Sequence, residues 1–232
     1  QRNKVTLPEP PTKKEIKMRR LLHIIVLTIS VWPLCSFGQT GHFVPSERFS
    51  SGLINDLCQD KYGYMWIATD YGLNRYDGYR FIEYQHQPED STTICSSNAI
   101  SLFCDKDGEL WVGTSKGLDR YDYGTGHFVH YPFERGTNPR VTKMTQLKDG
   151  RLIVATSGYH GLYYICDGMA VDFNEGDTKM PFVNSVFEDS HGRLWQCNFG
   201  DELTMKDQSG LHRMTSTQGF VVDFVQRGDE VL

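Results

Sequence analysis

The residues best suited to chemistry in this sequence are its cysteines. Five of them follow residue 38: Cys58, Cys95, Cys104, Cys166 and Cys197. In an exported protein an odd number argues against a full disulfide framework, and no C-x-x-C pair or Cys/His set has the spacing of a zinc site. We interpret the five as buried single thiols, with one fortuitous disulfide as the alternative. We expect no metal site.

The histidines are scattered and lie mostly near expected turns. Those after residue 38 are His42, His86, His127, His130, His160, His191 and His212. His127 and His130 fall in an expected outer strand, so we expect them to be solvated. The sequence has no H-E-x-x-H, P-loop or dinucleotide fingerprint. We therefore predict no catalytic residue and no cofactor.

A repeated phrase of the sequence indicates the architecture that positions these residues. Gly63 to Asp77 returns forty-five residues later as Gly108 to Asp122, and weaker copies begin at Gly150 and Gly192. A period of 40 to 50 residues rich in Gly, Trp and β-formers is typical of propeller blades, and the 3.6-residue pattern of helical repeats is missing. We predict an all-β protein, a β-propeller of four-stranded antiparallel blades.

Each unit reads as four short strands. In the first unit they are expected near Ile54 to Gln59, Tyr64 to Thr69, Leu73 to Asp77 and Arg80 to Tyr84, and glycines such as Gly63 would take a positive φ in the turns between them. The blades are expected at about 53–84, 98–131, 140–173 and 182–214, and a fifth begins at 219. Four blades and the start of another make the chain a fragment of a larger ring.

Two columns of the aligned repeat suggest different roles. Trp66, Trp111, Ile153 and Trp195 share one position, which we interpret as packing between blades. Polar residues share a position in the first strands, which line the central channel of a propeller: Asp56, Ser101, Lys143, Ser185 and Asp223. This polar column could face a ligand, whereas the alternative is a wet channel wall with no specific ligand.

The N-terminus has the pattern of an export signal. Residues 18–38 combine a basic start, an apolar run of about a dozen residues and small residues before a plausible cut. An uncleaved anchor is the alternative, and a lipoprotein acylated at Cys35 fits less well because Trp-Pro-Leu precedes that residue. Residues 1–17 read as a disordered or non-native leader, with translation starting at Met18, although a long basic leader is the alternative.

Removing residues 1–38 leaves an acidic chain. Seven Lys/Arg and two Asp/Glu are lost, so 17 basic residues face 27 acidic ones, a net charge near −10. Nucleic-acid binding depends on concentrated positive charge, so we expect no nucleic acid as a partner.

One pattern begins at both Asp60 and Asp105: D-x-x-G-x-[LM]-W-[IV]-[AG]-T followed by G-L-[ND]-R-Y-D. It resembles the two-component regulator propeller repeat. The segment Tyr84 to Ile94 resembles the linker between that family's first two blades. The resemblance covers residues 42 to 232 and weakens in the fourth unit, where Glu202 to Met205 replace the G-L-x-R-Y text. His42 to Val44 could supply the outer strand that closes the ring.

The resemblance implies a periplasmic sensor in a hybrid two-component system of Bacteroidetes. Such sensors place two seven-bladed propellers and a β-sandwich before a membrane helix, a histidine kinase and a DNA-binding regulator. They typically recognise breakdown products of complex glycans. On this basis the expected partners are an oligosaccharide, the remaining blades, a second propeller and a second copy in a homodimer, with an anchor in the inner membrane. The sequence does not identify the ligand or its contacting residues.

The sequence leaves three alternative functions for this protein. The first is a sensor propeller that detects a glycan-derived oligosaccharide and relays the signal to a cytoplasmic kinase. The second is an exported propeller glycan lyase or hydrolase, although neither the sialidase Asp-box nor the W-D dipeptide of WD40 blades is present. The third is a non-catalytic interaction scaffold.

Overall fold

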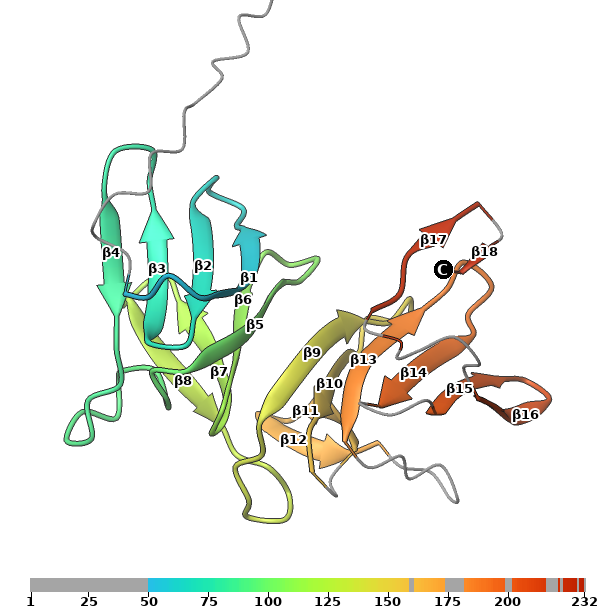
Figure 1. The fold of residues 1–232 in the computed structure, drawn as a ribbon. Coiled ribbons are helices and arrows are strands. Elements are labelled where there is room, and N and C mark those ends of the chain that lie inside the picture. Colours follow the sequence, from blue (N-terminus) through green and yellow to red (C-terminus); the bar gives the residue numbers. More distant parts are fainter. Residues whose placement is uncertain are drawn as a thin grey trace, which may run out of the picture. The chain divides into compact units, whose positions relative to one another are not determined.

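In this computed structural model the protein is built from strands (Figure 1). The structure describes residues 50–158, 161–173, 182–198, 202–215, 221, 223–228 and 230–231. The described elements are all strands, so these ranges contain no helix that is long and apolar enough to cross a membrane. The expected leader, signal peptide and closing strand at His42 to Val44 lie outside the described residues.

Four sheets of four antiparallel strands follow one another along the chain (Figure 1). The first contains β1 (Ile54–Gln59), β2 (Met65–Thr69), β3 (Gly72–Tyr76) and β4 (Phe81–Tyr84). The second contains β5 (Ala99–Cys104), β6 (Leu110–Thr114), β7 (Gly117–Asp122) and β8 (His127–Tyr131). In each sheet the strands pair in chain order, so every connection is a hairpin.

The third and fourth sheets repeat this plan. The third contains β9 (Val141–Gln146), β10 (Leu152–Thr156), β11 (Leu162–Cys166) and β12 (Met169–Asp172). The fourth contains β13 (Val183–Glu188), β14 (Leu194–Asn198), β15 (Glu202–Asp207) and β16 (Gly210–Thr215). The architecture is that of a β-propeller, and the strands of the first blade lie within one residue of the positions expected from the sequence.

The hairpin between the first and second strand of each blade depends on one glycine. Gly63, Gly108, Gly150 and Gly192 have φ between +76° and +94°, a conformation that a side chain resists. In each turn this glycine's N–H donates to the carbonyl of the residue three positions earlier, at 2.9 to 3.0 Å. The predicted role of these glycines is confirmed.

Apolar cores lie between successive sheets. One core joins the first two sheets around Trp66, which is fully buried, and another joins the second and third around Trp111. A third joins the third and fourth sheets around Ile153. The predicted packing role of this column is confirmed for these three residues, while Trp195 is half-buried with Phe224 at 6.4 Å between ring centroids.

The first strands of neighbouring blades lie side by side and are linked by hydrogen bonds. The side-chain amide of Asn55 donates to the carbonyl of Ala99 at 2.7 Å, and the hydroxyl of Thr142 donates to that of Val183 at 2.6 Å. The inner edges of the blades are thus joined by polar contacts, while the cores described above join their faces.

The expected fifth first strand differs from the structure. Val221 and residues 223–225 lie outside strands, and a short hairpin follows with β17 (Gln226–Arg227) and β18 (Glu230–Val231). The N–H of Phe224 donates to its neighbour's carboxylate, Asp223 Oδ1, at 2.9 Å rather than to a ladder carbonyl. The segment packs against the fourth blade through side chains, with the Phe224 ring stacked at 6.5 Å from that of Phe187.

Candidate functional site

An aspartate in the D-x-x-G turn connects each well-matched blade to its tryptophan. In the first blade Asp60 Oδ1 accepts the N–H groups of Tyr62 and Tyr64 at 2.9 and 3.0 Å. The other oxygen, Oδ2, accepts the Trp66 indole N–H at 2.7 Å and the Tyr123 hydroxyl of the next blade at 2.9 Å. Every strong acceptor position of this buried carboxylate is therefore used for structure, which leaves it unsuited to catalysis.

The same arrangement recurs in the second and fourth blades. Asp105 accepts the Trp111 indole N–H at 2.8 Å, and Asp189 accepts that of Trp195 at 2.9 Å. Burial would raise the pKa of Asp189, but hydrogen bonds from Trp195, Arg193 and His191 outweigh it and lower the pKa to about 2. The sequence pattern was assigned only to Asp60 and Asp105. Asp189 begins the same D-x-x-G-x-L-W pattern in the fourth blade.

The third blade replaces both members of this pair. Leu147 stands where the other blades have aspartate, Ile153 stands where they have tryptophan, and both are buried in one apolar core. Because a carboxylate without its donors would be costly to bury, the two positions change together.

The predicted polar column contains two different arrangements. Asp56 and Ser101 bond to the backbone of the next blade: Asp56 Oδ2 accepts the Leu102 N–H at 2.9 Å, and the Ser101 hydroxyl donates to the Val141 carbonyl at 3.5 Å. These two residues fit the alternative of a channel wall. Ser101 is buried, so it is not free to contact a ligand.

The other three column residues meet around one carboxylate. Lys143 Nζ lies 2.7 Å from Asp223 Oδ2, and the Ser185 hydroxyl donates to Oδ1 at 2.5 Å. Burial would raise the pKa of Asp223, but Lys143, Ser185 and the Phe224 N–H lower it below its ordinary value. The Lys143 and Asp223 side chains are 37% and 48% exposed, so both present charged hydrogen-bonding groups to solvent. We treat this group, the inner-strand polar cluster, as the candidate ligand contact.

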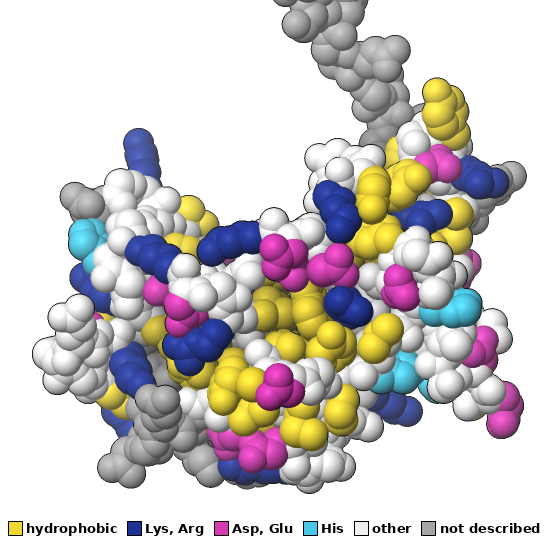
Figure 2. All heavy atoms as spheres, turned by 180° about the vertical axis from the view of Figure 1, so that it is seen from behind, with side chains coloured by type: hydrophobic (Ala, Val, Ile, Leu, Met, Phe, Trp, Pro, Cys, Tyr) yellow, Lys and Arg dark blue, Asp and Glu magenta, His cyan; other side chains and the backbone are white. Residues whose placement is uncertain are grey.

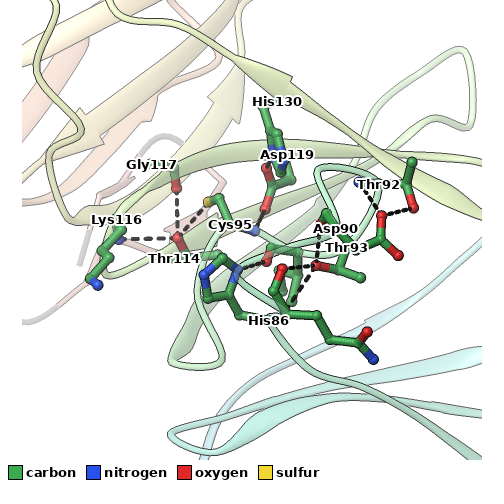
Figure 3. Close-up of polar contacts among 12 residues, drawn as sticks. His86, Asp90, Thr92, Thr93, Cys95, Thr114, Lys116, Gly117, Asp119 and His130 are labelled. Atoms are coloured by element: carbon green, nitrogen blue, oxygen red, sulfur yellow. Dashed lines mark hydrogen bonds and ion pairs between the residues drawn. The ribbon is translucent and has the colours of Figure 1, made fainter.

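A second group of chemically competent side chains lies in the second blade (Figure 3). The ligand atoms of Cys95, Asp119 and His130 all lie within 4.8 Å of one another. Sulfur, oxygen and nitrogen donors would suit a borderline-soft divalent ion such as zinc. Sequence spacing did not reveal this group because its members come from three different segments of the blade.

The donors of this group already have partners. Asp119 Oδ2 accepts the Cys95 N–H at 2.8 Å, and Oδ1 lies 2.5 Å from His130 Nδ1. Burial and the neighbouring Asp119 raise the pKa of the Cys95 thiol, which lies 3.1 Å from the Thr114 hydroxyl. A protonated thiol is a poor metal ligand.

The first blade has the same contacts without cysteine or histidine. Asn74 donates to the Ser50 hydroxyl at 2.6 Å, and that hydroxyl lies 2.8 Å from the Thr69 hydroxyl. Ser50 and Asn74 precede Cys95 and Asp119 by one repeat of 45 residues. The shared arrangement docks the segment before the first strand onto the blade, and only His130 is added to it.

The remaining histidines form no shared centre in the described part of the chain. His127 and His130 are both exposed, as predicted, and the His130 ring also contacts the buried Asp119. His86 Nδ1 lies 2.9 Å from the Ile94 carbonyl within the segment that joins the first two blades (Figure 3). His42 and His160 lie outside the described residues.

Three hollows lie on the described surface, and one of about 480 Å³ is lined by two turns of the fourth blade, His191 to Arg193 and Asp207 to Ser209. A hollow of about 270 Å³ lies between the third and fourth blades beside Arg151 and Phe173, and one of about 200 Å³ lies beside Thr92 and Phe128. Both are below the ~300–1,000 Å³ typical of ligand pockets. On the face in Figure 2, basic and acidic side chains are interspersed with hydrophobic ones, and the basic ones form no continuous patch.

The first two blades match a known repeat. The family model for the two-component regulator propeller matches residues 48–71 and 93–116. The chain carries two-component regulator propeller repeats. Both matched segments run from the docking residues before the first strand, through the D-x-x-G turn, to the turn after the second strand. The matched segments thus include the turn aspartates and tryptophans whose contacts are described above.

Three known proteins are similar to this chain in sequence or in fold. A histidine kinase P4 of Formosa agariphila is 44% identical over 52 residues, which is 22% of this chain and 4% of that protein. The extracellular domain of a protein described as a hybrid two component system from B. thetaiotaomicron is 19% identical, with a TM-score of 0.60 over 71% of this chain and 25% of its own. A virginiamycin B lyase of Staphylococcus aureus is 14% identical, with a TM-score of 0.58 over 78% of this chain and 61% of its own. The chain therefore spans only a small part of its two-component relatives.

Proposed function

We propose that this chain is part of an extracytoplasmic sensor that detects a glycan-derived oligosaccharide and relays the signal to a histidine kinase and transcription regulator. The two matched repeats carry this proposal, because they tie the D-x-x-G turns and inter-blade contacts to a signalling family. The sensor would lie in the periplasm, anchored through the parent protein to the inner membrane. The export pattern at residues 18–38 supports that location.

The geometry favours binding over turnover. The aspartates of the repeated turns are saturated by structural hydrogen bonds, so they are unavailable as general acids or bases. The inner-strand polar cluster instead presents an ammonium and a carboxylate that can each hydrogen-bond sugar hydroxyls. Similarity to lyases in fold does not favour an enzyme, since one propeller scaffold serves unrelated activities.

In this proposal the chain acts with other parts of its parent. Further blades and a second propeller would complete the sensor, and two copies would form a homodimer. Oligosaccharide binding would change the geometry of that dimer across the membrane. A ligand can shift such an equilibrium only by the difference in its affinity for the two arrangements.

Calorimetric titration of the complete exported part with a panel of oligosaccharides tests this proposal. We expect heat with one class of glycan fragment and no product in the same mixture by chromatography. Lys143→Met and Asp223→Asn should each weaken binding by roughly 10-fold or more, because a hydrogen bond to a charged group is worth about 1.5–3 kcal/mol.

The matched control for the titration is Lys116→Met. Lys116 is an exposed lysine on the β6–β7 hairpin and is not a member of the cluster. This variant should bind like the parent protein. Absence of heat with every sugar would contradict the sensor proposal and favour a scaffold, whereas cleavage of a glycan would favour the enzyme. Normal binding by both cluster variants would remove the cluster from the proposal.

A further inference from the structure

Two thiols from neighbouring blades are in direct contact. Cys58 in β1 and Cys104 in β5 have their sulfur atoms 2.8 Å apart, although 46 residues separate them in the sequence. Both side chains are half-buried at the edge of the core between the first two blades. Among the five cysteines of the described chain this is the one pair in contact: Cys95 contacts Thr114, Cys166 lies beside Asp167, and Cys197 is buried in β14.

The pair is not a product of the repeat itself. One repeat after Cys58 stands Phe103, and one repeat before Cys104 stands Gln59. The cysteines therefore occupy different positions of their strands, and they meet because β1 and β5 lie side by side. A repeat alignment cannot reveal such a contact, which explains why counting cysteines left the pairing open.

The surroundings favour a covalent link over a metal ion. The nearest turn carboxylate, Asp60, has both oxygens engaged by Tyr62, Tyr64, Trp66 and Tyr123. Two thiolates without further ligands fall short of the four that a structural zinc site uses. Bringing the sulfur atoms from contact to a bond length of about 2.0 Å requires a movement of less than about 1 Å.

The chemistry of the two thiols differs in a way that suits stepwise oxidation. The contact between the two sulfur atoms lowers the pKa of Cys58, and the same contact together with burial raises the pKa of Cys104. Cys58 is therefore the first nucleophile, since the thiolate is the reactive form.

We propose that Cys58 and Cys104 are the site of a disulfide that links the first blade to the second. The Cys58 thiolate attacks the disulfide of a thiol oxidant and releases one thiol, and Cys104 then displaces the second thiol from the mixed disulfide. The protein loses two electrons and two protons, and the oxidant's disulfide is reduced to two thiols. The supply of such an oxidant in the cell rests on the proposed export; the pairing itself does not.

Peptide mapping of the full-length protein tests the pairing. Reduced protein is equilibrated with glutathione disulfide, free thiols are blocked with N-ethylmaleimide, and tryptic peptides are analysed by mass spectrometry. Trypsin leaves Cys58 in residues 49–61 but places Cys95 and Cys104 together in residues 81–106. The Cys95→Ser variant removes that ambiguity, and we expect it to yield 49–61 linked to 81–106.

Two controls keep the result decisive. Cys197→Ser should retain the link, and the oxidised parent should unfold roughly 5–15 °C above its reduced form, a difference that Cys58→Ser abolishes. Fragmenting the linked peptide of the oxidised parent between Cys95 and Cys104 assigns the link without any variant. Maleimide on both Cys58 and Cys104, or a link from either one to another cysteine, would overturn the proposal.

Protein recovered from the cell envelope without added oxidant tests the location separately. A link present there supports both pairing and export. A link formed only by glutathione disulfide supports the pairing and counts against the proposed location.

Discussion

At the scale of single residues, the turn aspartates carry most of the specific contacts. Each divides its oxygens between the backbone of its own turn and the indole of its own blade, so it fixes both the hairpin and the orientation of the tryptophan. The arginine of the R-Y-D text adds a further contact, because Arg75 donates to the Tyr121 hydroxyl of the next blade at 3.2 Å and stacks 4.7 Å above the Tyr64 ring. These residues recur for structural reasons.

Removing one turn aspartate should therefore destabilise the protein strongly. Asp105→Ala leaves the Asp107 and Glu109 N–H groups and the Trp111 indole without their acceptor. We expect a loss of about 2–4 kcal/mol in the free energy of unfolding, measured by urea denaturation. Asp107→Ala, an exposed neighbour in the same turn, is the control and should change it by less than about 0.5 kcal/mol. Equal effects of the two substitutions would contradict this role.

His130 should make stability depend on pH. The hydrogen bond to Asp119 raises the pKa of His130 above its ordinary 6.5, although burial opposes this. A group with a raised folded-state pKa stabilises the fold fully below its unfolded pKa and loses that contribution as the pH rises through the folded value. His130→Gln should therefore destabilise the protein at about pH 5.5 and much less at about pH 9, by urea denaturation.

The exposed His127 provides the control for this titration. His127→Gln should show a difference from the parent protein that hardly changes with pH. A His130→Gln difference that stays constant or grows towards high pH would show that protonated His130 does not stabilise the fold.

At the scale of elements, the blades are held by close approach of their first and second strands. Gly113 in β6 shows how tight this approach is: a Cβ there would lie 2.3 Å from Ser101 Oγ and 2.5 Å from Val141 Cγ1. The first and third blades carry alanine at this position, Ala68 and Ala155. The space beside Gly113 is therefore too small for the methyl group that the alanines carry.

Gly113→Ala should destabilise the junction of the second and third blades. The added methyl group would displace Val141 from the core, at a cost of about 1–3 kcal/mol in the free energy of unfolding. Gly52→Ala is a matched control, since nothing lies within 4 Å of its Cβ and its φ suits any residue. Thermal denaturation should show a lower Tm for the first variant and little change for the second. A neutral Gly113→Ala would contradict the close packing.

The elements were more predictable from the sequence than the candidate sites were. Strands and turns depend on local sequence, such as the apolar run around Trp66 and the glycines of the D-x-x-G turns. A repeat of 45 residues was therefore enough to locate them. The column alignment also brought Lys143, Ser185 and Asp223 to one position. It did not reveal that they meet around one carboxylate, or that Cys58 meets Cys104, because those contacts depend on the stagger between neighbouring blades.

At the scale of the whole molecule, the first sheet leaves uncovered the positions that the other sheets bury. Leu57 is 54% exposed, whereas the corresponding Leu102, Met144 and Val186 are 2% to 8% exposed. Leu53 and Ile54 beside it are also exposed. An apolar sheet face of this kind normally packs against a neighbour.

A protein limited to residues 39–232 should therefore self-associate. We expect sedimentation velocity to show species that grow with concentration, because the uncovered face of the first blade is apolar. Leu57→Lys should reduce this association, while Lys116→Met, on the β6–β7 hairpin of the second blade, should not. A monomer at all concentrations, with or without Leu57→Lys, would contradict the interpretation of this face.

The sensor proposal makes one claim that a single measurement can decide. Sequencing the transcript beyond the codon for Leu232 should show further propeller blades, then a membrane-spanning segment and a histidine kinase in the same reading frame. A reading frame that ends after the propeller, or that continues into a catalytic domain acting on glycans, would contradict the proposal.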